Sequence, residues 1–226
     1  MDLFNFLKRK EIANLDYEST LFKKVNADTI SKNIKLLVIS DTHGDLTLNK
    51  NLQKKLQNIT NYDLCCILGD VYDTDYEVIL DIVPKNKIVA LLGNHDRFDL
   101  IKDKGIKDLN GKIVNVGGII IGGIEGSYKY KMEDFPSFTH KDSIAFVKTM
   151  PKVDILLSHD KPFIFDCHNP VHDGIKGITK FLYDNKVPLN IHGHLHKTYK
   201  SKLKNGTIIK GVYGIELVEI KSGKLL

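Results

Sequence analysis

The chain has 226 residues, of which 42% are apolar and 27% charged, and its 33 Lys and Arg residues outnumber its 28 Asp and Glu residues to give a net charge of +5. This length and composition suit one large domain, with or without a short appendage, whose core needs no disulfides. The lysines are scattered among acidic residues, which is typical of a solvated surface and argues against a dedicated polyanion-binding face.

Neither a membrane span nor a disulfide framework is indicated. No run approaches the ~18 apolar residues that cross a membrane, and the N-terminus lacks the continuous apolar segment of a signal peptide. Cys65 and Cys66 are adjacent inside an apolar run, and Cys167 is far from both. An odd number of cysteines without regular spacing favours a reducing compartment, so we expect a cytoplasmic protein with no membrane contact.

The first part of the chain divides into an extension and a repeating pattern. Residues 1–33 are polar and weakly patterned, so we expect a helical or partly mobile extension before one domain at residues 34–226. Residues 34–40 are almost continuously apolar, which predicts a strand buried on both faces, and the spacing over residues 46–59 predicts a helix. The same order of strand, polar loop and helix recurs up to residue 104. This order is typical of an α/β domain with parallel strands, whose functional groups gather after the strands.

The second half predicts shorter elements. Residues 112–124 indicate two short strands around glycine turns, and residues 141–150 a helix that ends at Pro151. A helix at about residues 174–185 follows a strand at 155–157 and precedes one at 189–191.

Two further segments are less regular. Residues 200–220 predict two or three antiparallel strands joined by Asn205-Gly206 and Tyr213-Gly214 turns. Residues 125–140 contain several aromatic side chains between Tyr128 and Phe138. These side chains either form a packed loop, which is the favoured interpretation, or cover a site and stack a base.

Five polar clusters each follow one of the apolar strands. They are Asp41-Thr42-His43, Gly69-Asp70 with Asp73, Gly93-Asn94-His95-Asp96, Ser158-His159, and Gly193-His194-Leu195-His196. Imidazole nitrogens together with carboxylate and amide oxygens suit intermediate divalent metals, and the lack of thiolates argues against a structural zinc site. Taken alone, His159 could be a core histidine and Asp70 a helix cap. Five clusters in one order, each after a strand, favour a metal site.

The spacing within the clusters supports this hypothesis. Residues two apart in extended backbone point the same way, so Asp41 with His43, and His194 with His196, can each direct two groups to one place. A glycine beside three of the clusters lets the backbone approach closely. A carboxylate can bridge two cations, an arrangement that serves phosphoryl transfer.

The ordered clusters resemble the calcineurin-like metallophosphoesterase superfamily, whose pattern reads D-x-H, G-D-x-x-D, G-N-H-D or G-N-H-E, a lone His, and G-H-x-H. The resemblance covers about residues 34–200, and every element of the pattern is present. It implies an α/β fold, a four-layer α/β/β/α sandwich of two mixed β-sheets flanked by helices.

The resemblance also implies two divalent metal ions per chain. The implied ligands are Asp41, His43 and His196 for the first ion, Asn94, His159 and His194 for the second, and Asp70 as a bridge between both. His95 would contact phosphate or act as the general acid, with Asp96 orienting its ring. Asp73 would support the site without binding metal. Mixed nitrogen and oxygen ligands suit manganese, iron, zinc or cobalt, and we favour manganese.

The implied activity is metal-dependent hydrolysis of phosphate esters by a hydroxide that bridges the two metals. We expect phosphodiester substrates, including nucleotide-derived ones, over monoesters of small molecules or phosphoproteins. A non-catalytic scaffold is a remote alternative, because scaffold members of this superfamily typically have eroded ligand sets. The diffuse charge does not indicate a nucleic-acid groove, and the sequence leaves the natural substrate and the oligomeric state open.

Overall fold

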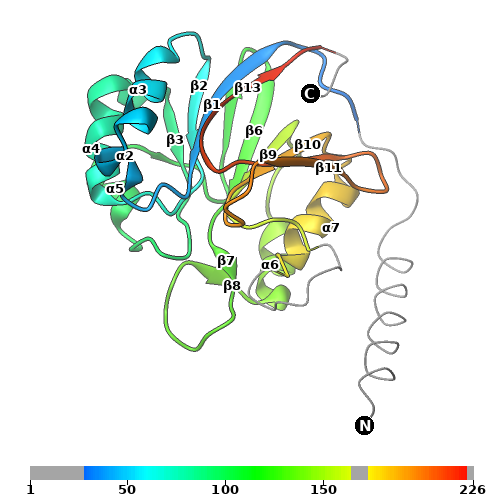
Figure 1. The fold of residues 1–226 in the computed structure, drawn as a ribbon. Helices are drawn as coiled ribbons and strands as arrows, with labels where there is room; N and C mark the ends of the chain where they lie inside the picture. The colour runs from blue at the N-terminus through cyan, green and yellow to red at the C-terminus, as the bar shows by residue number, and fades with distance from the viewer. Residues whose placement is uncertain (1–27, 164–172, 223–226) are drawn as a thin grey trace.

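The computed structural model describes residues 28–163 and 173–222. Most of the extension expected at residues 1–33, together with Cys167, therefore lies outside the described residues. Two β-sheets pack face to face, and helices cover the outer face of each (Figure 1). No helix in the described part of the chain is long and apolar enough to cross a membrane.

The first sheet has five strands and the second has six. In sheet order, the first comprises β13 (Gly214–Ile220), β1 (Ile34–Ser40), β2 (Leu64–Ile67), β3 (Ile88–Ala90) and β4 (Lys107–Asp108). The second comprises β11 (Tyr199–Lys202), β12 (Ile208–Gly211), β10 (Leu189–His192), β9 (Ile155–Ser158), β6 (Ile119–Ile124) and β5 (Ile113–Val116). Both sheets mix parallel and antiparallel pairs. A small parallel pair is formed by β7 (Ser127–Tyr128) and β8 (Ser137–Phe138).

The helices divide between the two outer faces (Figure 1). Those beside the first sheet are α2 (Asp45–Leu48), α3 (Lys50–Asn58), α4 (Asp73–Ile82) and α5 (Leu100–Lys104). Those beside the second are α6 (His140–Val147) and α7 (Lys176–Asp184), and a 3-10 turn η1 (Lys85–Lys87) precedes β3. This arrangement confirms the expected four-layer α/β/β/α sandwich.

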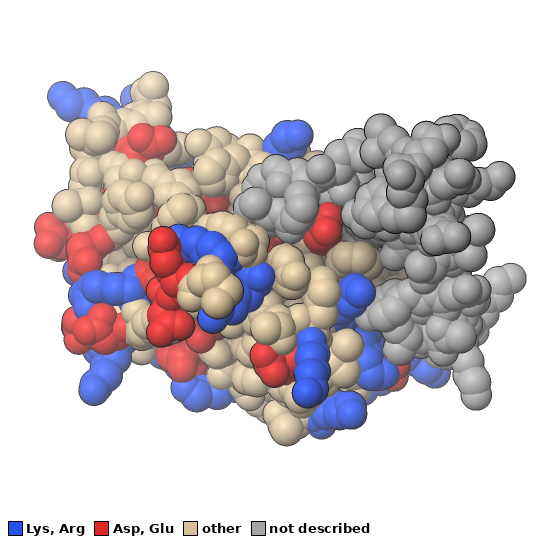
Figure 2. Space-filling view, turned by 90° about the horizontal axis from the view of Figure 1, so that it is seen from below, with Lys and Arg blue, Asp and Glu red and all other residues tan. Residues whose placement is uncertain are grey.

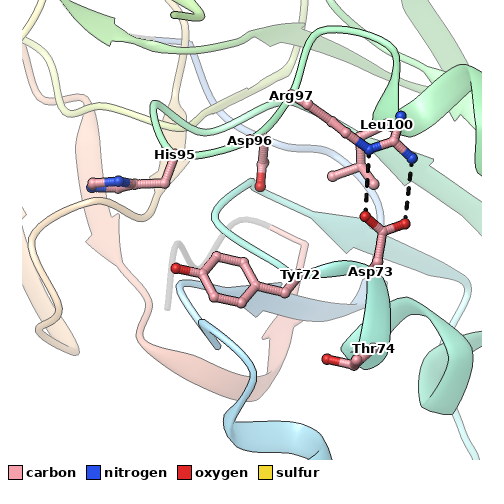
Figure 3. Close-up of a pocket in the computed structure, with 7 residues that line it drawn as sticks. All are labelled: Tyr72, Asp73, Thr74, His95, Asp96, Arg97 and Leu100. Atoms are coloured by element: carbon pink, nitrogen blue, oxygen red, sulfur yellow. Dashed lines mark hydrogen bonds and ion pairs between the residues drawn. The ribbon is translucent and has the colours of Figure 1, made fainter.

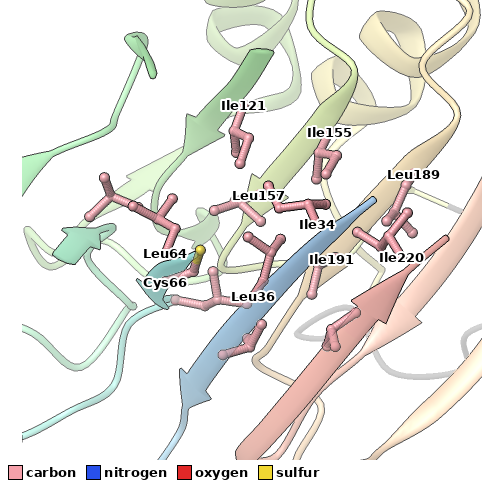
Figure 4. Packing of buried hydrophobic residues seen from close by; sticks show 14 of the residues in the cluster. Ile34, Leu36, Leu64, Cys66, Ile121, Ile155, Leu157, Leu189, Ile191 and Ile220 are labelled. Atoms are coloured by element: carbon pink, nitrogen blue, oxygen red, sulfur yellow. The ribbon is translucent and has the colours of Figure 1, made fainter. Parts of the chain in front are cut away.

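Alternate residues of β1 face the two sides of its sheet. Ile34, Leu36 and Val38 pack between the sheets against Leu157 and Ile191 of the second sheet (Figure 4). Leu37 and Ile39 instead pack toward the helices on the outer face. Both faces of the strand are thus buried, which explains its almost continuous apolar sequence.

Several elements differ from the sequence-based expectations, including the short strands β7 and β8 in the loop at residues 125–140. The helix expected over residues 46–59 is divided at Asn49, whose side chain accepts a hydrogen bond from the Asn51 amide and begins α3. The two-residue strand β4 was not expected. The tail does not form one antiparallel unit: β11 and β12 do pair through the Asn205-Gly206 turn, but β12 joins β10 in parallel, and β13 crosses to the first sheet to pair with β1.

The described residues that precede β1 and the loop at residues 125–140 both pack against the rest of the domain. Ile30 is 2% exposed in the core between the sheets, and the Asp28 amide donates to the Lys186 carbonyl oxygen at 2.8 Å. In the loop at residues 125–140, Tyr128 stacks on His140 with ring centroids 4.3 Å apart, and Phe138 contacts Phe146. These rings therefore belong to a packed loop, as favoured from the sequence.

Candidate metal centre

The five polar clusters converge where β1, β2, β3, β9 and β10 end. Two groups of three side chains could each hold a metal ion. Within each group the candidate ligand atoms, one per residue, all lie within 4.8 Å of one another. Asp41 belongs to both groups. The first group is Asp41, His43 and His196, and the second is Asp41, Asp70 and His159. The two sheets thus bring together residues from both ends of the motif series.

The first group directs its donor atoms to one point. The Nε2 atoms of His43 and His196 are 3.1 Å apart, and Asp41 Oδ1 lies 3.5 Å from the His196 Nε2. Asp41 is 1% exposed, and its carboxylate accepts hydrogen bonds from the Ser40 hydroxyl and the His194 amide. These bonds fix the direction in which the carboxylate points.

The second group provides a test of whether a cation fits. His159 is fully buried and its Nδ1 donates to the Leu68 carbonyl oxygen at 2.8 Å, so in the neutral ring Nε2 carries only a lone pair. That Nε2 faces Asn94 Oδ1 at 2.9 Å and Asp70 Oδ2 at 3.6 Å. Buried acceptor atoms that face one another need a proton or a metal ion between them.

The pKa of His159 also supports a cation in the second group. Burial lowers the pKa of His159, but the negative charges of Asp70, Asp41 and Asp96, together with the hydrogen bond to the Leu68 carbonyl oxygen, raise it overall. Surroundings that stabilise a proton on this ring also stabilise a divalent cation at the same place. The donor set therefore fits a metal ion of the intermediate class.

Asp70, a member of the second group, also faces the first group. Its Oδ1 accepts a hydrogen bond from the His95 amide at 2.8 Å. Its Oδ2 lies 3.8 Å from His43 Nε2 and 3.6 Å from His159 Nε2, so one oxygen faces both groups. This is the orientation that a bridging carboxylate requires.

The backbone at the candidate site is strained. Six described residues other than glycine have positive φ, and five of them are predicted metal ligands: Asp41 (55°), His43 (45°), Asp70 (53°), His194 (65°) and His196 (49°). Such conformations cost of order 1–3 kcal/mol each and persist where the surroundings fix them. Here the Asp41 and His43 amides donate to the carbonyl oxygens of Gly69 and Asp70.

The remaining predicted ligands lie nearby. His194 is 6% exposed, and its ring centroid is 5.1 Å from that of His159. A Cβ atom at Gly93 would lie 2.1 Å from Asp70 Oδ1, so only glycine allows the two loops to meet here. This close approach is what the sequence predicted for the glycines beside the clusters.

Asp73 does not support the site as expected. Its side chain is 50% exposed and forms ion pairs with Lys104 and Arg97 on the surface. Its neighbour Asp75 takes the supporting role instead: it is fully buried and accepts hydrogen bonds from the Thr42 hydroxyl and from the amides of Gly44 and Thr47. These bonds hold the loop that carries His43.

Asp96 also acts differently from the expectation that it orients the His95 ring. Its Oδ2 accepts hydrogen bonds from the amides of Asp70 (2.9 Å) and Gly93 (2.7 Å), and its buried Oδ1 has no hydrogen-bond partner among the described residues. Burial and the charge of Asp70 raise its pKa to about 7. Asp96 thus joins two loop backbones, while the His95 ring lies beside His43, with centroids 5.6 Å apart.

Besides Asp75, sequence reasoning missed two further polar residues near the site. The Tyr130 hydroxyl accepts a hydrogen bond from Asn94 Nδ2 at 3.4 Å, and Asp160 Oδ1 lies 4.0 Å from His194 Nε2. The only feature of the sequence that could have indicated Asp160 is its position directly after His159. Tyr130 comes from the irregular loop, whose path the sequence pattern does not predict.

Comparison with known proteins identifies relatives. A family model described as calcineurin-like phosphoesterase matches residues 34–198. No curated protein matches this chain significantly. Among solved structures, the protein TT1561 of Thermus thermophilus has a TM-score of 0.58 and 13% identity, with 83% of this chain and 98% of that chain covered.

Two further structures share the fold. Phosphopantetheinyl hydrolase (PptH) from Mycobacterium tuberculosis has a TM-score of 0.54 and 14% identity, with 82% of this chain and 91% of that chain covered. A 5'-nucleotidase from Candida albicans has a TM-score of 0.51 and 12% identity, with 84% of this chain and 47% of that chain covered. At such identities the likeness shows the fold alone.

Proposed function

The chain belongs to the calcineurin-like phosphoesterase family, and from that premise we propose that it hydrolyses phosphate esters with two divalent metal ions per chain. The single observation that carries the proposal is Asp70 Oδ2, which faces His43 Nε2 at 3.8 Å and His159 Nε2 at 3.6 Å. One ion would be held by Asp41, His43 and His196, the other by Asn94, His159 and His194, and Asp70 would bridge them.

When bound, the two ions would neutralise phosphate oxygens and lower the pKa of the water that attacks phosphorus. The nitrogen and oxygen donors suit manganese, iron, zinc or cobalt, and manganese remains our first choice. His95 would protonate the oxygen of the leaving group. Asp96 supports that step indirectly, because its bonds to the amides of Asp70 and Gly93 set the positions of both loops.

We propose phosphodiesters as the preferred substrates and monoesters as the alternative. A diester needs room for a substituent on each side of the phosphate. The His196 side chain is 51% exposed, and Tyr72 and Tyr213 are each 44% exposed on either side of the candidate ligands. This openness supports a diester.

Charge distribution and cysteine burial bear on partners and location. In Figure 2 basic and acidic side chains are interspersed over the face shown, which supports a small substrate over a nucleic-acid duplex. Cys65 and Cys66 are free, buried thiols, which supports a reducing compartment, and we propose the cytoplasm.

The proposal is tested with a matched pair of chromogenic esters. We expect manganese-loaded protein to hydrolyse bis(4-nitrophenyl) phosphate with a higher kcat/KM than 4-nitrophenyl phosphate, and chelator to abolish both reactions. A monoester preference of roughly tenfold would favour the alternative. No hydrolysis of either ester with any of the four metals would favour a scaffold that acts through protein contacts.

A further inference from the structure

A hollow of about 360 Å³ opens beside the candidate metal centre, between the loop that follows β2 and the loop that follows β3 (Figure 3). Its lining residues are Tyr72, Asp73, Thr74, His95, Asp96, Arg97 and Leu100. Of these residues, only His95 and Asp96 were given a role at the candidate metal site. The hollow is therefore a candidate for binding a different part of the substrate.

The hollow begins at the metal centre. The rings of Tyr72 and His95 each lie 5.6 Å from the ring of His43, measured between centroids. His43 is a proposed ligand, and His95 is the proposed acid for the leaving oxygen. A phosphate ester bound at the centre, with its leaving oxygen at His95, would direct the leaving group into this hollow.

The walls of the hollow suit a flat apolar group. Tyr72 is 44% exposed, so part of its ring is free to contact a ligand, and Leu100 is 2% exposed and closes the hollow toward the core. Tyr72 directly precedes α4, and Leu100 is the first residue of α5. An aromatic ring placed against Tyr72 would gain offset or edge contacts that an aliphatic chain cannot make.

The charge around the hollow disfavours an anion. Arg97 is already bound by three carboxylates: its Nη1 lies 2.5 Å from both Asp99 and Asp103, and its Nη2 lies 3.4 Å from Asp73. Lys104 is also paired with Asp73, at 2.7 Å. Three carboxylates thus oppose two cations, and the guanidinium is not free to receive a second anionic group from a substrate.

We propose that this hollow is the leaving-group subsite and selects phosphate esters whose leaving group is a flat, uncharged ring system, such as an aryl or nucleobase-bearing alcohol, over an anionic one. This inference rests on the proposed phosphoesterase function. In the reaction, water loses one proton to the solvent as its oxygen forms the new bond to phosphorus, and the bond from phosphorus to the leaving oxygen breaks. That oxygen takes a proton from His95, which regains one from the solvent.

Binding of non-hydrolysable probes tests the subsite without catalysis. We expect manganese-loaded protein to bind phenylphosphonate roughly threefold to tenfold more tightly than methylphosphonate in calorimetry, the range of one aromatic contact. Tyr72→Phe should keep the preference and Tyr72→Ala should lose it. Phe98→Ala is the matched control, because Phe98 is an exposed ring on the same loop as His95 but outside the lining. A preference that survives in Tyr72→Ala would overturn the assignment.

The charge selection is tested by hydrolysis of two phenyl phosphates that carry a para-carboxamide or a para-carboxylate. We expect a higher kcat/KM for the carboxamide, and a smaller difference in the double variant Asp99→Asn/Asp103→Asn and at high salt. Equal rates for both esters, unchanged in Tyr72→Ala, would overturn the subsite and leave the phosphoesterase standing. No hydrolysis of either ester with any of the four metals would overturn both proposals.

Discussion

Asp75, fully buried at the start of α4, accepts a hydrogen bond from the Thr42 hydroxyl at 2.5 Å. The same carboxylate accepts from the amides of Gly44 and Thr47, at 2.9 and 3.2 Å. Three donors, two from the loop after β1 and one from α2, therefore converge on one side chain of α4. Because Thr42 lies between Asp41 and His43, this contact positions two of the predicted metal ligands.

Asp75→Asn should lower both stability and metal affinity. An amide group presents one acceptor where the carboxylate presents two, so at least one loop donor loses its partner, at a cost of about 1–3 kcal/mol. Thermal unfolding without metal, and metal titration, would measure the two effects. Asp73→Asn is the matched control, because that carboxylate is half exposed and its ion pairs contribute little, so stability should change by no more than about 0.5 kcal/mol.

Asp70→Asn should reduce the metal content of the purified protein. The substitution keeps the size of the side chain but removes the negative charge that faces His43 and His159. We expect affinity for at least one ion to collapse, together with hydrolytic activity. Elemental analysis would measure this, and retention of two tightly held ions with intact activity would refute the bridging role.

Gly193→Ala should disrupt the first group of ligands, although Gly193 is not itself a predicted ligand. A Cβ atom at this position would lie 1.9 Å from Ser40 Oγ and 2.5 Å from Asp41 Oδ2, so the carboxylate of Asp41 has to move. We expect weaker metal binding and a lower melting temperature. Gly193 does not have a positive φ, so both effects are expected from the clash and not from backbone strain.

The sequence predicted the parts of the site that depend on strand ends. Residues 34–40 are apolar on both faces because β1 lies between a second sheet and the outer helices. A strand of that kind ends at the edge where functional loops gather, so the positions of Asp41, Asp70 and His159 followed from the local pattern. The family resemblance then supplied the order of the motifs.

The sequence did not predict features of the site and fold that depend on tertiary packing, such as the direction in which a side chain points. Asp73 and Asp75 are both acidic residues in the first turn of α4, and only the packing of that helix decides that Asp75 points inward. Asp96 was expected to contact the His95 ring, but a sharp turn directs its carboxylate to the amides of Asp70 and Gly93. The strand β13 crosses to the first sheet, which no hairpin signal could indicate.

Glu125→Gln should change how stability depends on pH. Burial and the nearby charge of Asp108 raise the pKa of Glu125 from 4.5 to about 7, although Lys112 opposes this. The folded protein therefore binds this proton more tightly than the unfolded chain, and the resulting stability is complete below about pH 4.5 and lost as the pH rises through about 7. Glutamine stays neutral, so the variant should gain melting temperature relative to the wild-type chain at about pH 8.

The comparison for Glu125 is made in chelator, so that metal binding does not contribute. Melting temperatures of both proteins are measured from about pH 5 to about pH 8, and the difference between them should grow across this interval. A constant difference would mean that folding does not raise the pKa of Glu125.

His95→Gln should separate metal binding from chemistry. The His95 ring contacts His43 by its edge, whereas its backbone amide, which glutamine retains, donates to Asp70 Oδ1 at 2.8 Å. Metal content should therefore stay near that of the unmodified protein. If the ring is the general acid, kcat should fall by roughly two to four orders of magnitude for an ester with a poor leaving group.

Comparing esters with good and poor leaving groups distinguishes two roles for His95. A nitrophenolate departs without a proton, so its ester should lose much less rate in His95→Gln than an alkyl ester does. Equal losses for both esters would indicate that His95 binds phosphate instead, and loss of metal would indicate that it is a ligand.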